Sequence, residues 1–295
     1  MLPRPHNIEA TMAVAKLCLV AALLMVASAD ECLLPPMDPS PETIQPVWLA
    51  SFPGSGSELL RSLVEGLTGH PTDEVYNRAS DCNYHPVLCK THWPLWIGGH
   101  RHWGPVHRPS FADSSIVLLR NPLHAIPSFF NYKWEESHGV PDHSMQGSEE
   151  DWIEWRDRRF DGTLQAWKHL LETWDAGLYV VYEDLVDPVQ GPVVLEEVGR
   201  LLEQVGTPVQ QHSYDCLWKT VVQERATQKR RPNHTTPRFT KAQLTAMRDV
   251  LTSMENPALA SVLRGYTAQV EALLLSSTQS LRGASSYSGE NPTVG

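Results

Sequence analysis

Positive charge is scarce in this sequence. Its 295 residues include 24 lysines and arginines against 34 aspartates and glutamates, which gives a formal net charge of −10. A chain with this balance does not offer the broad basic surface that nucleic-acid binding needs. A local basic site within an acidic surface is still allowed. Nucleic acid is therefore not a predicted partner, whereas a single anionic ligand is not excluded.

Long hydrophobic runs are scarce as well. The uncharged segment LCLVAALLMVASA, residues 17–29, falls short of the about 20 residues that span a membrane. It follows a weakly basic leader and ends in Ala-Ser-Ala, a pattern typical of a secretory signal peptide. We predict a signal peptide over residues 1–29 and a proline-rich stem over 30–46. A signal anchor that stays in the membrane is the alternative.

Cysteine is rare too, with five residues in the chain. Loss of the leader would leave Cys32, Cys82, Cys89 and Cys216, and entry into the secretory pathway would allow them to pair. Four cysteines permit three complete pairings, between which the sequence does not choose. Cys82 with Cys89 would close a short loop and is one prediction, while small buried side chains are the alternative. Asn233 lies in an Asn-x-Thr sequon, which fits a luminal, glycosylated protein.

The nucleotide-triphosphate signature G-x-x-x-x-G-K-[ST] is absent, which argues against a kinase or an ATPase. In its place the segment SFPGSGSELLRSL, residues 51–63, sets two glycines between an apolar run and a helical pattern. Unsatisfied amides at a helix start bind anions, and Gly54 and Gly56 allow tight curvature and close approach of a ligand. Alone, the segment predicts either an anion site or a simple strand–helix turn.

Strand and helix patterns alternate from residue 47 onward. Short apolar runs predict strands at 47–52, 87–92, 115–120 and 178–183. Helical patterns are present at 59–67, 124–134, 149–175, 193–206 and 240–254. The last has Thr240 as N-cap and Gln243 in the capping-box place. Such alternation predicts an α/β fold, a single domain over 47–275 with a central parallel sheet flanked by helices. Residues 276–295 are predicted to be a flexible tail.

Two segments carry side chains suited to an anionic ligand. Arg120 ends the strand at 115–120, at the edge of a parallel sheet where ligands bind, and Ser128 follows in the next helix. Lys90 and His92 lie two residues apart in CKTHWP, on one side of an extended segment. A histidine there can take a proton, and a lysine can stabilise charge on a leaving group. Taken alone, Arg120 is explained equally well as part of a surface ion pair, and His92 as a structural histidine.

Taken together, these segments resemble the sulfotransferase superfamily, which uses 3′-phosphoadenosine 5′-phosphosulfate (PAPS). The matching segments are FPGSGSEL (52–59), KTHWP (90–94), RNPLHAIPSFF (120–130), YED (182–184) and QKRRPNHTTPRFTKAQ (228–243). They arrive in the family's order and span residues 47 to about 255. The resemblance implies a P-loop-like loop that binds phosphosulfate.

The resemblance also assigns roles to individual residues. The loop that would hold the 5′-phosphosulfate consists of Pro53, Gly54, Ser55, Gly56, Ser57 and Glu58. The residues near the 3′-phosphate and the adenine would be Arg120, Ser128 and Tyr182. A late loop that closes on the cofactor would contain Lys229, Arg230 and Arg231. His92 would be the catalytic base and Lys90 would stabilise the leaving group. PAPS is the only cofactor implied and no metal is required; His100, His102 and His107 lack companions at ligand spacing.

Two departures from the family pattern bear on activity. Gly54 stands where many members have a lysine, and Leu59 where many have a tryptophan. Lys90, Arg61 or both are expected to replace the lost charge. We predict a luminal, Golgi or secreted enzyme that sulfates a hydroxyl or amine acceptor, a carbohydrate or small molecule. A catalytically silent relative that binds nucleotide or a partner is the alternative. The oligomeric state is left open.

Overall fold

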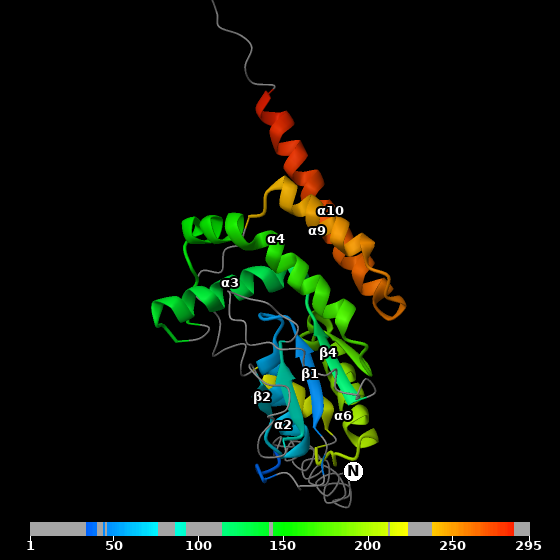
Figure 1. Ribbon diagram of the computed structural model, residues 1–295. Coiled ribbons are helices and arrows are strands. Elements are labelled where there is room, and N and C mark those ends of the chain that lie inside the picture. The colour runs from blue at the N-terminus through cyan, green and yellow to red at the C-terminus, as the bar shows by residue number, and fades with distance from the viewer. Residues whose placement is uncertain are drawn as a thin grey trace, which may run out of the picture. The chain divides into compact units, whose positions relative to one another are not determined.

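Five short parallel strands form one sheet in the described part of the chain (Figure 1). In chain order the strands are β1 (Val47–Ser51), β2 (Asp73–Val75), β3 (Leu88–Thr91), β4 (Ser115–Leu119) and β5 (Leu178–Val181). Their order across the sheet is β2-β3-β1-β4-β5, with Ala50 of β1 beside Thr91 of β3 and Val117 of β4. The predicted parallel α/β sheet is confirmed.

This computed structural model describes residues 34–39, 44, 46–75, 86–92, 114–141, 144–211, 213–223 and 238–285. The longer helices are α2 (Ser57–Thr68), α3 (Pro122–His138), α4 (Glu149–Thr173), α6 (Gln190–Gln204), α9 (Lys241–Ser253) and α10 (Ala260–Ser285). The short helical segments are α5 (Tyr182–Leu185), α7 (Tyr214–Trp218), the π-helical η2 (Lys219–Gln223) and the 3-10 segment η3 (Pro257–Leu259).

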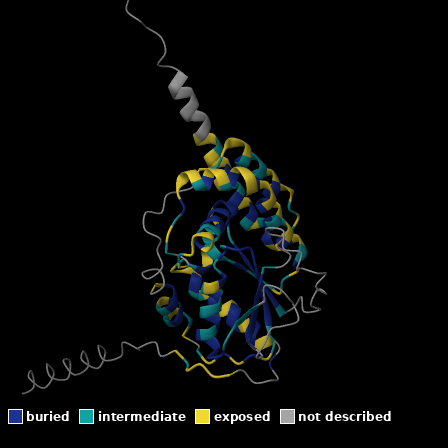
Figure 2. Cartoon of the chain, turned by 60° about the vertical axis from the view of Figure 1, so that its left-hand side comes forward, coloured by how far each residue is buried: buried dark blue, intermediate teal, exposed yellow. Residues whose placement is uncertain are grey.

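The two faces of the sheet are covered by different helices. Alternating strand side chains such as Ala50 and Val117 pack with α3, α4, α9 and α10. The other side chains, such as Leu49 and Ile116, pack with α2, α6 and α7. Figure 2 shows the resulting layer of buried strands between partly exposed helices. All residues of β1, β3 and β4 are buried, as expected for central strands of a parallel sheet.

Local sequence signals set several helix boundaries. The predicted capping box of α9 is confirmed, since Thr240 Oγ1 accepts from the Gln243 amide at 3.2 Å and Gln243 returns a bond to Thr240. Helix α4 begins in the same way, with Ser148 and Asp151. Helix α2 ends at Gly69, whose φ of 68° is the left-handed conformation that glycine tolerates.

Several elements differ from the sequence-based prediction. Strand β5 ends at Val181 and Tyr182 begins the short helix α5, whereas the apolar pattern had extended the strand to 183. Strand β2 is an acidic three-residue edge strand, which gives too short a pattern to recognise. Helix α10 was also missed, and it runs to Ser285, beyond residue 276 where the tail was predicted to begin.

The chain divides into two units, Met1–Leu34 and Pro35–Gly295, and the elements above belong to the second. Within the described residues, no helix combines the length and the apolar character needed to cross a bilayer. The predicted leader at 1–29 lies outside the described residues, as does most of the predicted stem.

Candidate functional site

The site lies where the direction of strand addition reverses. The chain places β2 and β3 on one side of β1 and then β4 and β5 on the other. Ligands of open parallel sheets bind outside the carboxyl ends of the strands at such a switch point. Here the loop after β1 begins at Phe52, and Arg120 directly follows β4. The predicted glycine loop and the predicted arginine therefore meet at this end of the sheet.

The loop after β1 is a tight turn built on two glycines. Gly54 has φ 84° and Gly56 φ 93°, both in the left-handed region. The Ser55 amide donates to the Phe52 carbonyl at 3.1 Å and closes the turn after the buried Pro53. A Cβ at Gly54 would lie 2.8 Å from the Ala125 carbonyl oxygen. A lysine cannot occupy this position unless the loop moves, because the backbone of α3 fills the space.

The loop offers polar atoms that the protein leaves unpaired. Ser55 is fully buried, and its Oγ has no hydrogen-bond partner in the described part of the chain. Gly56 is the N-cap of α2 and makes no side-chain cap, so the amides of Ser57 and Glu58 lie in the first turn, where helix amides lack intrahelical acceptors. The Ser55 amide, in contrast, is committed to the turn. A buried hydroxyl beside a helix N-terminus suits an anion.

Arg120 contacts both the loop after β1 and the start of α5. Its Nη1 donates to the Gly54 carbonyl at 2.6 Å, and its guanidinium carbon lies 4.3 Å from the centroid of the Tyr182 ring. Its Nε is buried without a partner among the described residues. The Trp167 indole donates to the Arg120 carbonyl at 3.1 Å and fixes the backbone. Gly54 and Tyr182 thus hold the guanidinium group in place, while its Nε–H has no acceptor among the described residues.

Tyr182 and Ser128 border the same loop. A Cβ at Gly56 would lie 2.3 Å from Cε2 of Tyr182, so the tyrosine ring packs directly on this glycine. A Cβ at Gly54 would lie 2.9 Å from Cβ of Ser128. The residues predicted to contact the 3′ side and the adenine therefore lie against the loop predicted to contact the 5′ side.

His92 follows β3 and contacts the end of β1. Its Nδ1 lies 2.7 Å from the Ser51 carbonyl oxygen and 3.3 Å from Ser51 Oγ. A carbonyl only accepts, so Nδ1 carries the proton and Nε2 is the acceptor nitrogen of the neutral ring. Burial lowers the pKa of His92 to about 4, and the nearby positive charge of Lys90 acts in the same direction. The imidazole is therefore neutral at pH 7.

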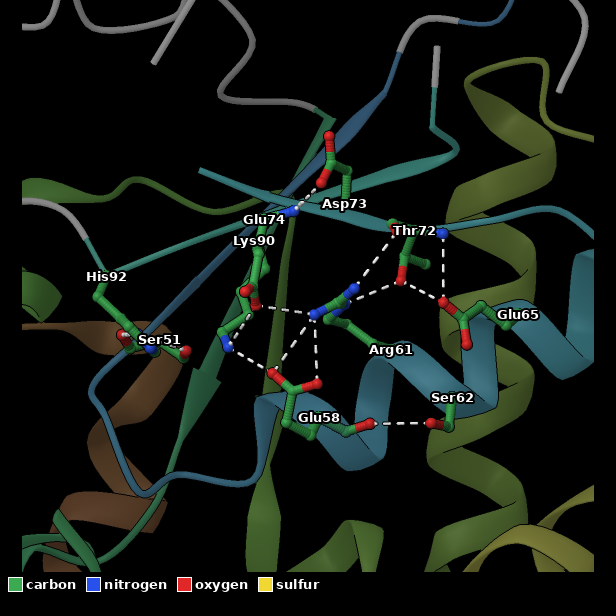
Figure 3. A network of polar contacts seen from close by, with 10 residues as sticks. All are labelled: Ser51, Glu58, Arg61, Ser62, Glu65, Thr72, Asp73, Glu74, Lys90 and His92. Atoms are coloured by element: carbon green, nitrogen blue, oxygen red, sulfur yellow. Dashed lines mark hydrogen bonds and ion pairs between the residues drawn. The ribbon is translucent and has the colours of Figure 1, made fainter. Parts of the chain in front are cut away.

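Two cations and two carboxylates form a network beside the loop (Figure 3). The buried Lys90 ammonium pairs with Glu58, and with Glu74 of β2 at 3.2 Å. Arg61 pairs with the same carboxylates, at 3.2 Å to Glu58 and 2.9 Å to Glu74. Burial raises the pKa of Glu58, but Lys90 and Arg61 outweigh it and hold the pKa below its ordinary value.

The sequence predicts that Lys90, Arg61 or both supply the positive charge of the missing loop lysine. Both cations lie near the loop, but each is bound to two carboxylates. Glu74 was not predicted to take part, because strand β2 was not recognised. The acidic Asp-Glu pair at 73–74 is the signal that could have drawn attention to it.

Some predicted residues lie outside the described part of the chain. They include Lys229, Arg230 and Arg231 of the late basic loop, together with the sequon at Asn233. Cys89 and Cys216 are each disulfide-bonded. In the described ranges no group of three His, Cys, Asp or Glu side chains could hold a metal ion, and the histidines at 100, 102 and 107 fall outside those ranges.

Comparison with known proteins finds distant relatives. The chain is 29% identical over 185 residues to "WSCD family member GA21586" of Drosophila pseudoobscura pseudoobscura, and 26% identical to "WSCD family member CG9164" of Drosophila melanogaster. Each alignment covers 57% of this chain and 52% of the relative, so the chain spans about half the length of the curated relatives it matches. No family model and no solved structure matches. The chain thus shares distant homology with WSCD family members.

Proposed function

We propose that this chain is a sulfotransferase that uses PAPS to sulfate a hydroxyl or amine group of a carbohydrate or small molecule. The observation that carries the proposal is the pair of unused donors at the switch point, Ser55 Oγ and Arg120 Nε. Buried polar groups normally have partners, so two unpaired ones beside a glycine loop suit a polyanionic ligand. The segments that resemble the sulfotransferase superfamily, among them KTHWP (90–94) and RNPLHAIPSFF (120–130), support the same conclusion.

The residues present fit a nucleotide with phosphate groups on both sides. The first turn of α2 and the Ser55 hydroxyl would hold the 5′ side. Arg120 and Ser128 would hold the 3′-phosphate, and Tyr182 would lie near the base. The late loop with Lys229, Arg230 and Arg231 would add positive charge. When bound, PAPS supplies an activated sulfuryl group, whose bond to the 5′-phosphate breaks as the acceptor bonds to sulfur.

His92 has the protonation state that a base needs. The Ser51 carbonyl holds the Nδ1 proton, so Nε2 would take the acceptor proton. The pKa of about 4 keeps the ring neutral at pH 7, although it also makes the ring a weak base. A nearby sulfuryl or phosphate anion would raise this pKa, because negative charge favours the imidazolium.

Lys90 would stabilise the leaving phosphate in competition with two carboxylates. Its ammonium pairs with Glu58 and Glu74, whose negative charges offset the positive charge offered to a ligand. This pairing is also the observation that favours a second candidate function. A silent relative would bind nucleotide while Glu58 keeps Lys90 neutralised.

We also propose that the protein works in the secretory pathway, in the Golgi or outside the cell. The disulfides at Cys89 and Cys216 support this location, because such bonds persist in oxidising compartments. The predicted leader over residues 1–29 and the sequon at Asn233 point the same way.

A transfer assay tests the proposed activity. The purified full chain is incubated with radiolabelled PAPS and a panel of carbohydrate and small hydroxyl or amine acceptors. His92→Ala should lower transfer roughly 10²-fold to 10⁴-fold if His92 is the base. Arg120→Ala should weaken binding of adenosine 3′,5′-bisphosphate by roughly tenfold to a hundredfold. Arg158→Ala is the matched control, since this arginine lies exposed on α4.

The outcomes separate the two candidates. Transfer by the wild type that falls in the His92 variant supports the enzyme and its base. Tight bisphosphate binding without transfer to any acceptor supports the silent relative. Equal binding by wild type and Arg120→Ala would show that the nucleotide does not bind at the switch point of the sheet.

A further inference from the structure

A polar relay joins helix α10 to the turn that follows β4. Glu183, at the start of α5, accepts the backbone N–H of Asn121 at 3.0 Å through one carboxylate oxygen. Its other oxygen accepts the Tyr266 hydroxyl at 2.7 Å, and Tyr266 belongs to α10. Asn121 directly follows Arg120. One carboxylate therefore connects α10 to the backbone that presents the arginine.

A second contact reaches the same turn from α10. The Asn121 side-chain amide donates to Oε1 of Gln269 at 2.9 Å. The Asn121 side-chain oxygen accepts the Leu123 amide at 3.0 Å and caps α3. Asn121 is fully buried, so both polar groups of its side chain depend on these partners. The start of α3 is thus held by its own cap, by Glu183 and by Gln269.

The chemistry of the relay keeps its donors and acceptors fixed. Tyr266 is 4% exposed. Burial raises the pKa of Tyr266, and the negative charge of Glu183 raises it further. The hydroxyl therefore stays protonated and donates to the carboxylate at physiological pH. A hydrogen bond from a neutral hydroxyl to a charged carboxylate is strong, so the Tyr266–Glu183 bond resists displacement of the turn.

We propose that Glu183, Tyr266 and Gln269 are positioning residues that fix the Arg120–Asn121 turn for binding of a nucleotide 3′-phosphate. Helix α10 then contributes to nucleotide binding through the turn, without direct contact with the ligand. The proposal rests on the proposed function for the identity of the nucleotide. The hold on the turn itself does not depend on any ligand.

Two variants test the relay in the full-length protein. Tyr266→Phe removes one hydroxyl and keeps the ring. Glu183→Gln keeps the shape of the side chain. It removes the negative charge and replaces one of the two acceptor oxygens with an NH₂ group. The control is Tyr179→Phe on β5, whose hydroxyl donates to the Trp174 carbonyl at 3.3 Å and contacts Asn256 at 3.2 Å. It removes the same hydroxyl group from a tyrosine that bonds to Trp174 and Asn256 instead of to the relay.

The first readout needs no ligand. Hydrogen exchange is followed in the peptide that contains the amides of Asn121 and Leu123. We expect exchange there to speed up about threefold to tenfold in Tyr266→Phe and more in Glu183→Gln. Tyr179→Phe should leave this peptide unchanged. Unchanged exchange in both relay variants would overturn the proposed hold on the turn.

The second readout isolates the 3′-phosphate. Binding of adenosine 3′,5′-bisphosphate and of adenosine 5′-monophosphate is measured by calorimetry. We expect the relay variants to weaken the bisphosphate about threefold to tenfold and the monophosphate less than twofold. Equal weakening of both nucleotides would contradict a role directed at the 3′-phosphate. Failure of the wild type to bind either nucleotide would remove the proposed function and the 3′-phosphate role, while the exchange result would still decide the hold on the turn.

Discussion

The Arg120 guanidinium donates to the carbonyl oxygen of Gly54 at 2.6 Å and ties the end of β4 to the loop after β1. The same glycine packs against α3 on its other side. The loop is therefore fixed between a charged donor and a helix backbone. This arrangement explains why position 54 has no room for a side chain.

Gly54→Ala should destabilise the protein by roughly 1–3 kcal/mol. The new Cβ would meet the Ala125 carbonyl oxygen and the Phe129 amide nitrogen at 2.8 Å, and φ is 84°. Urea unfolding measures the change. The matched control is Gly162→Ala in α4, where a Cβ meets nothing within 4 Å. That variant should be neutral or slightly more stable, because alanine favours helix. A stable Gly54→Ala protein would show that the loop is free to move.

Glu58→Gln should tighten binding of adenosine 3′,5′-bisphosphate roughly threefold to tenfold, because it removes a negative charge beside the site. The same change should cost about 1–3 kcal/mol of stability, since the buried Lys90 loses one of its two carboxylate partners. Calorimetry and urea unfolding measure the two effects.

Glu74→Gln is the matched control for the Glu58 variant. It pairs with the same two cations but lies on β2, outside the loop. It should lower stability and leave nucleotide affinity within about twofold of the wild type. An equal gain in bisphosphate affinity from both variants would contradict this prediction. It would mean that the two carboxylates weaken nucleotide binding equally.

His92 should make the stability of the protein depend on pH. Its pKa is about 4 in the folded protein and 6.5 as the ordinary value, so the unfolded chain binds more protons between these values. Stability therefore falls as the pH drops from about 6.5 to 4. The wild type should lose up to about 3 kcal/mol relative to His92→Gln across this window, with a constant difference above it.

Urea unfolding at pH 7.5, 5.5 and 4.5 checks this dependence. Gln165→Ala, at an exposed position on α4, is the control; it changes no titratable group and should keep a constant difference from the wild type. A gap between wild type and His92→Gln that stays the same at all three values would contradict the lowered pKa of His92.

The two disulfide-bonded cysteines should have different partners. Cys89 packs on the sheet face covered by α3 and α4, whereas Cys216 belongs to α7 on the opposite face. We therefore expect Cys89 to pair with Cys82, and Cys216 to pair with a different cysteine.

Mass spectrometry of a non-reduced digest identifies the linked peptides. A peptide that joins Cys82 to Cys89 is expected. A peptide that joins Cys89 to Cys216 would contradict the placement of these residues on opposite faces. Treatment with a reductant separates the linked peptides and serves as the control.

Local chemistry let the sequence determine much of this protein. The buried strands, the capping box of Thr240 and Gln243, and the glycine turn at 54–56 all depend on neighbouring residues, so the pattern was enough to predict them. The parallel sheet followed from the alternation of strands and helices. The order of the strands was not specified by that alternation.

Tertiary structure alone decided which side chains meet. Lys90 meets Glu58 across 32 residues of sequence, Glu183 meets Asn121 across 62, and Tyr266 meets Glu183 across 83. No local pattern encodes such contacts, because they depend on how the strands are ordered and how helices pack on the sheet. The sequence thus located the loop and its arginine, whereas the fold determined that carboxylates neutralise Lys90 and that helix α10 supports the turn.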